Sequence, residues 1–174
     1  MYISDDVASP QLKFDGIWGE WGPMEVCPQN GYALSFGEKY EYPPAISLRD
    51  YDNTFLNSIC LYCSTGGQVC SLEGSYGDWK VSPTSKMGFN GAMLSSEPNE
   101  GTGDDTAADK LKLYRGDDEF ITDHPKSIYG IWRERQNCPA GEIICGLSTR
   151  VQTQAMPPSD DTGLNGVILQ CCPG

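Results

Sequence analysis

Apolar and polar residues alternate in short runs along this chain of 174 residues. The clearest pairs are Leu111 with Leu113 and Val167 with Leu169, each separated by one residue of the other face. Successive side chains of a strand point to opposite faces of a sheet, so each pair lies on one face. Further apolar runs of strand length occur at 32–36, 91–95 and 143–151. The pattern predicts short β-strands over most of the chain.

The segments between these runs are rich in Pro, Gly, Asp and Asn, as in 96–104 and 156–160. These residues favour turns, and the 20 Gly and 12 Pro of the whole chain interrupt any long helix. Many short strands at intervals of roughly 8–12 residues are typical of an all-β sandwich, barrel or prism.

Two motifs recur three times in the same order. A Gly/aromatic motif reads Trp-Gly-Glu-Trp, Tyr-Gly-Asp-Trp and Tyr-Gly-Ile-Trp at 18–21, 76–79 and 129–132. A second motif has an acid or amide, Thr, two small or apolar residues, Asn or Asp, and then alternating apolar positions, at 53–61, 105–113 and 161–169. Such repetition indicates copies of one unit that share a core. We therefore predict a single domain over 1–174, with repeats at approximately 1–66, 67–116 and 117–174.

One segment, 106–114, has an apolar spacing that a helix could also show. Its counterparts in the other copies contain poor helix formers such as Gly163 and Gly166, so we predict a strand there. We also expect an edge strand at 2–7, pairing with a sheet from another copy. The residues expected in equivalent inward positions are Leu61, Leu113 and Leu169.

Threefold repetition restricts the architecture. One small sheet cannot bury its apolar face alone, whereas three sheets around a pseudo-threefold axis can share a core, which is a β-prism. A three-bladed propeller is unusual, because propellers typically have four to eight blades. A β-trefoil is the main alternative, because it is also threefold, with repeats of similar length.

The charge of the chain excludes some partners. The chain has 12 Lys and Arg residues and 24 Asp and Glu residues, which gives a net charge of −12. This sign opposes nucleic acid binding and a polybasic membrane anchor. No apolar run approaches the roughly 20 residues of a spanning helix. Residues 1–10 lack a signal-type apolar stretch, so the leader of a secreted protein would already be absent. The acidic surface is expected to attract basic proteins.

The chain has eight cysteines, an even number that favours four disulfides in an extracellular protein. Cys60 and Cys63 have the spacing of zinc ligands, but no second such pair exists. The single histidine, His124, is remote from them in sequence and precedes a proline, so we place it in a loop. We expect neither a metal ion nor a cofactor.

Three parts of the sequence resemble the vitelline membrane outer layer protein 1 family: Gly-x-Trp-Gly-x-Trp at 16–21, Asp-Asp-Thr-Ala-Ala-Asp at 104–109 and the final Cys171-Cys172. The resemblance runs from about residue 16 to 172 and includes all three repeats. It implies a β-prism I fold of three Greek-key antiparallel sheets. It also implies secretion, and a role in an egg coat or mucosal secretion. The family is linked to carbohydrate, so oligosaccharides or glycoproteins of the coat are the implied partners.

The cysteines depart from the family pattern. The second repeat usually has its own disulfide there, but here 80–86 and 114–115 contain no cysteine, while Cys60 and Cys70 are additional. Repeat equivalence pairs Cys27 with Cys63 and Cys138 with Cys171; Cys145 then pairs with Cys172, and Cys60 with Cys70 by elimination. Neighbouring Cys171 and Cys172 point to opposite faces of a strand, so they should have different partners.

The recurring aromatic and acidic residues are the candidate binding groups. Trp21, Trp79 and Trp132 match across the copies and have glycine neighbours, so we predict that they lie in the core. The Asp-Thr segments are interpreted mainly as turn-forming, since Asp, Asn and Thr bond nearby backbone N–H groups. A glycan site, if present, would use the variable aromatic position and these polar residues: Trp18, Tyr76, Tyr129, Asn53, Asp105 and Asp161. The first and second repeats are altered, so one site is expected rather than three.

Catalysis has little support in the sequence. A Ser-His-Asp mechanism needs a positioned histidine, and the two carboxylates of a glycosidase could come from any acidic surface. We therefore predict a secreted extracellular-coat protein with a structural and glycan-binding, lectin-like role. The alternative is a carbohydrate-active enzyme acting on chitin-type oligosaccharides. Two close, partly buried carboxylates in a cleft would favour the enzyme, and a shallow aromatic and polar depression at one end of the prism would favour binding.

Overall fold

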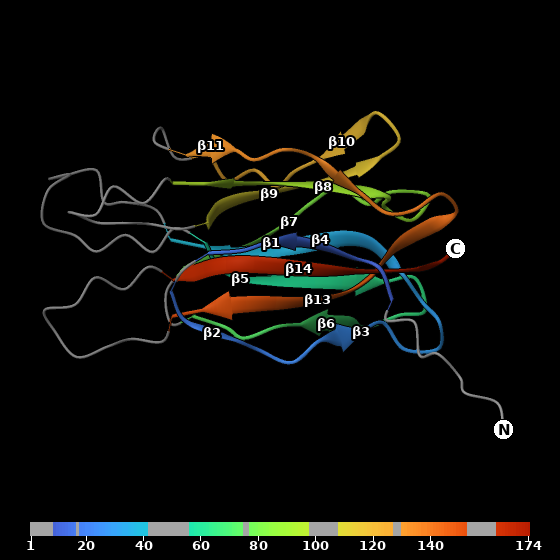
Figure 1. Ribbon diagram of the computed structural model, residues 1–174, viewed down its shortest axis with the longest axis horizontal. Coiled ribbons are helices and arrows are strands. Elements are labelled where there is room, and N and C mark those ends of the chain that lie inside the picture. Colours follow the sequence, from blue (N-terminus) through green and yellow to red (C-terminus); the bar gives the residue numbers. More distant parts are fainter. Residues whose placement is uncertain are drawn as a thin grey trace, which may run out of the picture.

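The computed structural model describes residues 9–16, 18–41, 56–74, 77–97, 108–126, 130–152 and 163–174. These residues form strands and irregular segments, without a helix (Figure 1). The strands are β1 (Gln11–Phe14), β2 (Glu20–Trp21), β3 (Glu25–Val26), β4 (Ala33–Tyr40), β5 (Leu56–Cys63), β6 (Gln68–Cys70), β7 (Asp78–Val81), β8 (Gly91–Ser96), β9 (Ala108–Arg115), β10 (Asp118–Phe120), β11 (Ile131–Trp132), β12 (Gln136–Asn137), β13 (Glu142–Val151) and β14 (Leu164–Pro173).

The strands form three antiparallel sheets whose longest strands run along the long axis of the molecule (Figure 1). We call them the first, second and third sheets. The first has the order β6-β5-β4-β7, and the second has β10-β9-β8-β11 with β12 also on β8. The third has β1-β14-β13-β2, with β3 also on β13. The predicted all-β architecture of three antiparallel sheets is therefore confirmed, including the strand predicted at 106–114, where the described part is β9.

One apolar core lies between the three sheets and takes residues from each. Leu61 of β5, Leu113 of β9 and Leu169 of β14 are all 0% exposed, which confirms their predicted inward positions. Phe89 packs edge-on against Phe36, with ring centroids 6.5 Å apart, and so joins the first and second sheets. Burial of such side chains contributes roughly 1.5–3 kcal/mol each.

Each Gly/aromatic motif contributes the edge strand of a sheet whose longer strands lie elsewhere in the sequence. β7 follows β6 in the chain but pairs with β4, and β11 pairs with β8. β2, near the start of the chain, pairs with β13 near its end. The sheets thus draw strands from both sides of the predicted repeat boundaries, and those boundaries stay a prediction. The edge strand predicted at 2–7 lies outside the described residues.

The prediction that the recurring tryptophans lie in the core is wrong. Trp79 is 39% exposed, and Trp21 and Trp132 are only partly buried. They belong to short edge strands, and the rings of Trp21 and Trp132 lie near cations. The Nζ atom of Lys13 lies 5.6 Å from the ring centroid of Trp21, and that of Lys112 lies 4.4 Å from the ring of Trp132.

The Asn or Asp of the second motif occupies the same place in all three sheets. Asn57, Asp109 and Asn165 are buried, and each lies where the pairing register of its sheet shifts. Such a shift is a β-bulge, which bends a strand and increases its twist. This motif position therefore has a structural role, in keeping with the interpretation of the motif as mainly structural.

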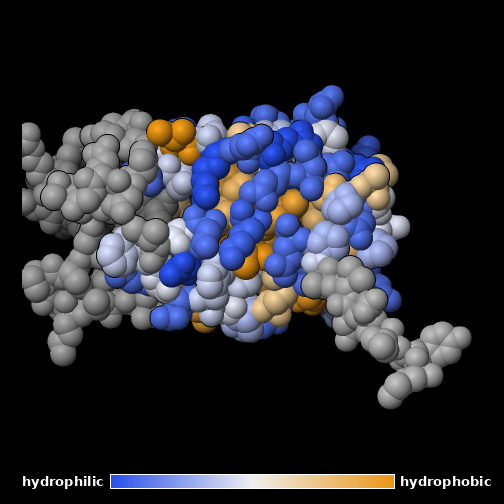
Figure 2. All heavy atoms as spheres, in the orientation of Figure 1, coloured by the Kyte–Doolittle hydropathy of each residue, from blue (hydrophilic) through white to orange (hydrophobic). Residues whose placement is uncertain are grey.

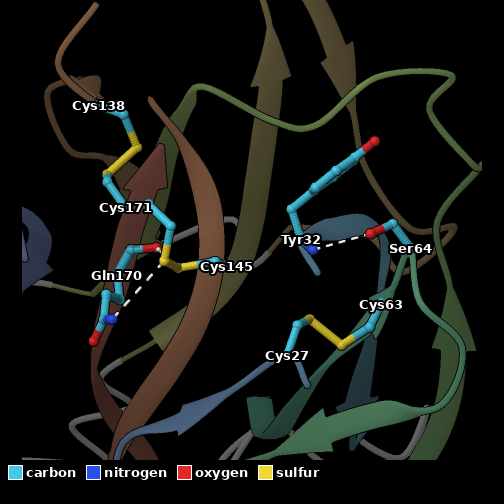
Figure 3. Close-up of a disulfide and its surroundings, with 9 residues drawn as sticks. Cys27, Tyr32, Cys63, Ser64, Cys138, Cys145, Gln170 and Cys171 are labelled. Atoms are coloured by element: carbon cyan, nitrogen blue, oxygen red, sulfur yellow. Dashed lines mark hydrogen bonds between the residues drawn. A yellow bond between two sulfur atoms is a disulfide. The ribbon is translucent and has the colours of Figure 1, made fainter. Parts of the chain in front are cut away.

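All eight cysteines are paired, in the combinations that repeat equivalence gave. Cys27–Cys63 joins the segment after β3 to the end of β5, with Cα atoms 5.6 Å apart, and Cys138–Cys171 joins the segment after β12 to β14, at 5.8 Å (Figure 3). Both bridges connect different sheets. The other two bridges, Cys60–Cys70 and Cys145–Cys172, lie within the first and third sheets. A disulfide typically contributes about 2–4 kcal/mol.

A buried carboxyl group joins the first and second sheets. Glu38 on β4 accepts hydrogen bonds from the Oγ1 of Thr122, at 3.0 Å, and the backbone N–H of Leu111, at 3.3 Å. The Nζ of Lys110 donates to the carbonyls of Thr122, at 2.9 Å, and His124. Burial raises the pKa of Glu38 to about 7, although the charge of Lys110 opposes this rise.

His124 lies in the irregular segment after β10, which confirms its predicted position in a loop. It is only 2% exposed, because its ring stacks on Tyr40 with centroids 4.5 Å apart. Burial and the charges of Lys110 and Lys80 lower the pKa of His124. The histidine is therefore part of the packing between the first and second sheets.

Replacing Leu113 with Ala should lower the free energy of unfolding by about 2–5 kcal/mol, because the substitution leaves a cavity in the shared core. Denaturant unfolding of the disulfide-intact protein measures this. Ile131→Ala is the control, because Ile131 is 61% exposed and its loss should cost about 0.5 kcal/mol or less. Similar losses in the two variants would contradict the inward position of Leu113.

The folded protein should bind a proton on Glu38 more tightly than the unfolded chain, because the ordinary pKa of 4.5 is raised to about 7 on folding. The free energy of unfolding should therefore fall as pH rises between these values, by roughly 3 kcal/mol from this group alone. Glu38→Gln, which resembles the protonated form, should remove this part of the slope. Urea unfolding between pH 4 and 8 tests it, with exposed Glu134→Gln as control. Equal slopes for wild type and Glu38→Gln would contradict the assignment.

Candidate functional site

Of the six residues predicted for a glycan site, the structure describes Trp18. This side chain is 47% exposed. The adjacent Gly19 has a φ of +87° and lies against Val151, the last residue of β13; a Cβ atom there would lie 2.4 Å from the carbonyl carbon of Val151. The other five residues lie outside the described residues: Asn53, Tyr76, Asp105, Tyr129 and Asp161. Their assembly with Trp18 stays a prediction.

A depression of about 420 Å³ lies at the other end of the prism, where β4 and β13 begin and β14 ends. Glu142, the first residue of β13, lines it, whereas Trp18 lies near the last residue of that strand. The strand has 10 residues. At a rise of roughly 3.3 Å per residue, the two places are roughly 30 Å apart. None of the six predicted residues lines the depression.

Tyr32 supplies an aromatic ring to the depression. Its backbone N–H donates to the Oγ of Ser64, at 3.1 Å, and its carbonyl accepts from the N–H of Ser64, at 2.7 Å. The ring extends away from the neighbouring disulfide Cys27–Cys63 (Figure 3). Gly88 lies against it, since a Cβ on Gly88 would lie 3.0 Å from the Cδ2 atom of Tyr32. The backbone bonds and the disulfide thus hold this ring on a rigid support.

Two further residues of the depression are positioned by backbone contacts. The Oδ1 of Asn90 accepts from the N–H of Gly116 at 3.0 Å, so the side chain can offer a ligand its Nδ2 donor. The Nη1 of Arg115 donates to the carbonyl of Gly88 at 3.2 Å, which fixes the guanidinium group beside the ring of Tyr32. The depression therefore presents hydrogen-bond donors next to an aromatic face.

Glu142 provides the acceptor. Its Oε2 atom is buried and accepts no hydrogen bond from any residue that the structure describes. A buried polar atom without a partner costs about 1–3 kcal/mol, so a donor from a bound molecule or from water would be stabilising here. Glu142 is also the one carboxylate side chain that lines the depression.

The same wall of the depression contains cysteine. Cys138 lines it, and its bridge to Cys171 fixes the wall to β14.

Within the described residues, no group of three His, Cys, Asp or Glu side chains is arranged to hold a metal ion. Nor does the described part of the chain include a helix of the length and apolarity needed to span a bilayer.

Sequence reasoning did not find the depression. Tyr32, Lys86, Asn90, Arg115 and Glu142 come from separate segments that carry no repeated motif, and they meet only because strand ends of all three sheets converge there. The nearest signal in the sequence is the position of cysteines beside them, Cys27 before Tyr32 and Cys138 before Glu142. Those bridges brace this end of the prism.

Comparison with known proteins shows the relationship of the chain. The family described as vitelline membrane outer layer protein I matches residues 9–174. The chain belongs to this family. The mouse vitelline membrane outer layer protein 1 homolog is 34% identical over 167 residues, covering 90% of this chain and 79% of the mouse protein. The human homolog is 34% identical over 172 residues, covering 93% of this chain and 81% of the human protein.

Two solved structures share the fold. A mannose-binding lectin from Champedak superposes with a TM-score of 0.56 at 10% identity, covering 94% of this chain and 97% of the lectin. The Vibrio cholerae biofilm matrix protein Bap1 superposes with a TM-score of 0.52 at 10% identity, covering 93% of this chain and 23% of Bap1. With the three sheets, the lectin likeness confirms the predicted β-prism around a pseudo-threefold axis.

Proposed function

We propose that this protein is a secreted component of an extracellular coat, and that it binds oligosaccharide in the depression at the Tyr32 end of the prism. Membership of the vitelline membrane outer layer family supports the coat role. Four disulfides, two of them between sheets, suit an oxidising environment and a protein that must persist there. The acidic surface, much of it hydrophilic in Figure 2, suits association with basic proteins of a coat.

The observation that carries the binding proposal is the combination of groups in the depression. A sugar ring offers an apolar C–H face and a rim of hydroxyl groups. Tyr32 can stack on the former, while Asn90, Arg115 and Glu142 can bond the latter. Its volume, about 420 Å³, lies within the roughly 300–1,000 Å³ of small-molecule sites. The site predicted around Trp18, at the opposite end of the prism, is the alternative position for the same activity.

No observation favours the alternative of an enzyme acting on chitin-type oligosaccharides. The depression has one carboxylate side chain, whereas the usual mechanisms need an acid and a nucleophile or base. We therefore prefer binding without turnover.

Tyr32→Ala should weaken oligosaccharide binding about tenfold, the loss expected when a stacking ring of roughly 0.5–1.5 kcal/mol and its buried area are removed. Tyr32→Phe keeps the ring and should retain most of the affinity. A glycan array identifies ligands for the intact protein, and calorimetric titration of the best ligand measures each variant.

Trp18→Ala separates the two ends of the prism in the same titration. Unchanged affinity in this variant, with loss in Tyr32→Ala, is the expected result. Loss in Trp18→Ala alone would move the site to the opposite end. An intact protein that binds no saccharide at all would leave a purely structural coat role.

A further inference from the structure

The side chains that line the depression include more cations than anions, although the chain as a whole is acidic. The chain has twice as many acidic as basic residues, 24 against 12. The charged side chains that line the depression are Lys86, Arg115 and Glu142, two cations and one anion. An excess of cationic side chains in a concave site is not expected from the acidic composition, and it affects which ligands the depression can hold.

The two cations are not neutralised by neighbours. Lys86 and Arg115 take part in none of the ion pairs among the described residues, whereas Lys39, Lys112 and Arg150 each have a carboxylate partner within 3.4 Å. The contact of Arg115 is instead with the neutral carbonyl of Gly88. Lys86 is exposed and lies two residues before Gly88, so both cations flank the same stretch of backbone.

The acidic residues near the depression lie outside it. Asp117 and Asp118 follow Arg115 in an exposed turn and do not line the depression. Charges in water are screened over about 8 Å at physiological ionic strength, so the distant acidic surface contributes little inside a concave site. A ligand placed between Lys86 and Arg115 therefore experiences their charge together with that of Glu142.

We propose that the depression selects acidic saccharides, in which a sugar unit carries one carboxylate or sulfate group. This inference rests on the proposed glycan-binding function and specifies its ligand. The anionic group lies against Lys86 and Arg115, where charge-assisted hydrogen bonds are shorter and stronger than neutral ones. An N–H or hydroxyl of the sugar donates to the buried Oε2 of Glu142, and an apolar ring face covers Tyr32. A polyanion concentrated at one point is disfavoured, because Glu142 repels it.

The test uses the intact, disulfide-bonded protein and three tetrasaccharides titrated by calorimetry. Chitotetraose is neutral, a hyaluronan tetrasaccharide carries carboxylates, and a chondroitin sulfate tetrasaccharide carries carboxylates and sulfates. Both acidic probes should bind about tenfold or more tightly than chitotetraose at low salt, and this preference should shrink as salt is added. The relative affinity of the two acidic probes shows whether sulfate adds to carboxylate.

Variants locate the preference. Lys86→Glu should abolish the preference for acidic probes, and it should not disturb the fold, because Lys86 is exposed. Lys80→Glu is the charge-matched control, because Lys80 is exposed on β7 and does not line the depression. Glu142→Gln keeps the acceptor oxygen and removes the repelling charge, so it should raise affinity for the acidic probes.

Four results would overturn the inference. Equal affinity for neutral and acidic probes would show a glycan site without charge selection, and the proposed function would stand. Acidic binding that survives Lys86→Glu, or is lost equally in Lys80→Glu, would place the anion elsewhere on the protein. Failure of every saccharide to bind would overturn the proposed function as well.

Discussion

The fold depends on the pairing of strands from the two ends of the chain. β14 pairs with β1 through Gln11–Phe14, and β13 pairs with β2 and β3. Without these partners the third sheet would have two open edges and the core would be exposed on one side. Leu12 and Phe14, only 4% and 1% exposed, complete the core from β1. Contacts between residues so distant in sequence form slowly during folding. The disulfides between sheets then link these segments covalently.

This pairing of strands that are distant in sequence explains which parts of the fold the sequence could predict. Alternation of apolar residues indicated strands, and three copies of two motifs indicated three sheets with Leu61, Leu113 and Leu169 in one core. The predicted core position of the tryptophans was wrong for a physical reason. Recurrence shows that Trp21, Trp79 and Trp132 occupy equivalent places, but it does not say which face of a sheet they cover. Here none of the three rings is buried, and those of Trp21 and Trp132 lie near lysine side chains.

The buried polar residues between the first and second sheets depart from the threefold symmetry. Asn57, Asp109 and Asn165 repeat the same bulge, whereas Glu38 has Leu94 at the corresponding position of β8 and Thr149 at that of β13. The carboxyl group of Glu38 is buried and accepts hydrogen bonds from Thr122 and Leu111. Ionisation of a buried carboxyl group costs free energy, and the pKa of Glu38 is therefore raised. This junction therefore has a stability that depends on pH, while the other two junctions are each crossed by a disulfide.

The candidate site follows the same logic. The repeated motifs predicted a site at the end of the prism near Trp18, because repeats within one chain identify only residues that recur. The depression at the opposite end is made of unique residues, and its groups meet through convergence of strand ends rather than through a motif. The three similar sheets place rigid strand ends in equivalent positions. Selective binding, however, needs a different side chain at each of these strand ends. Tyr32, Arg115 and Glu142, each near the end of a strand in a different sheet, provide that difference.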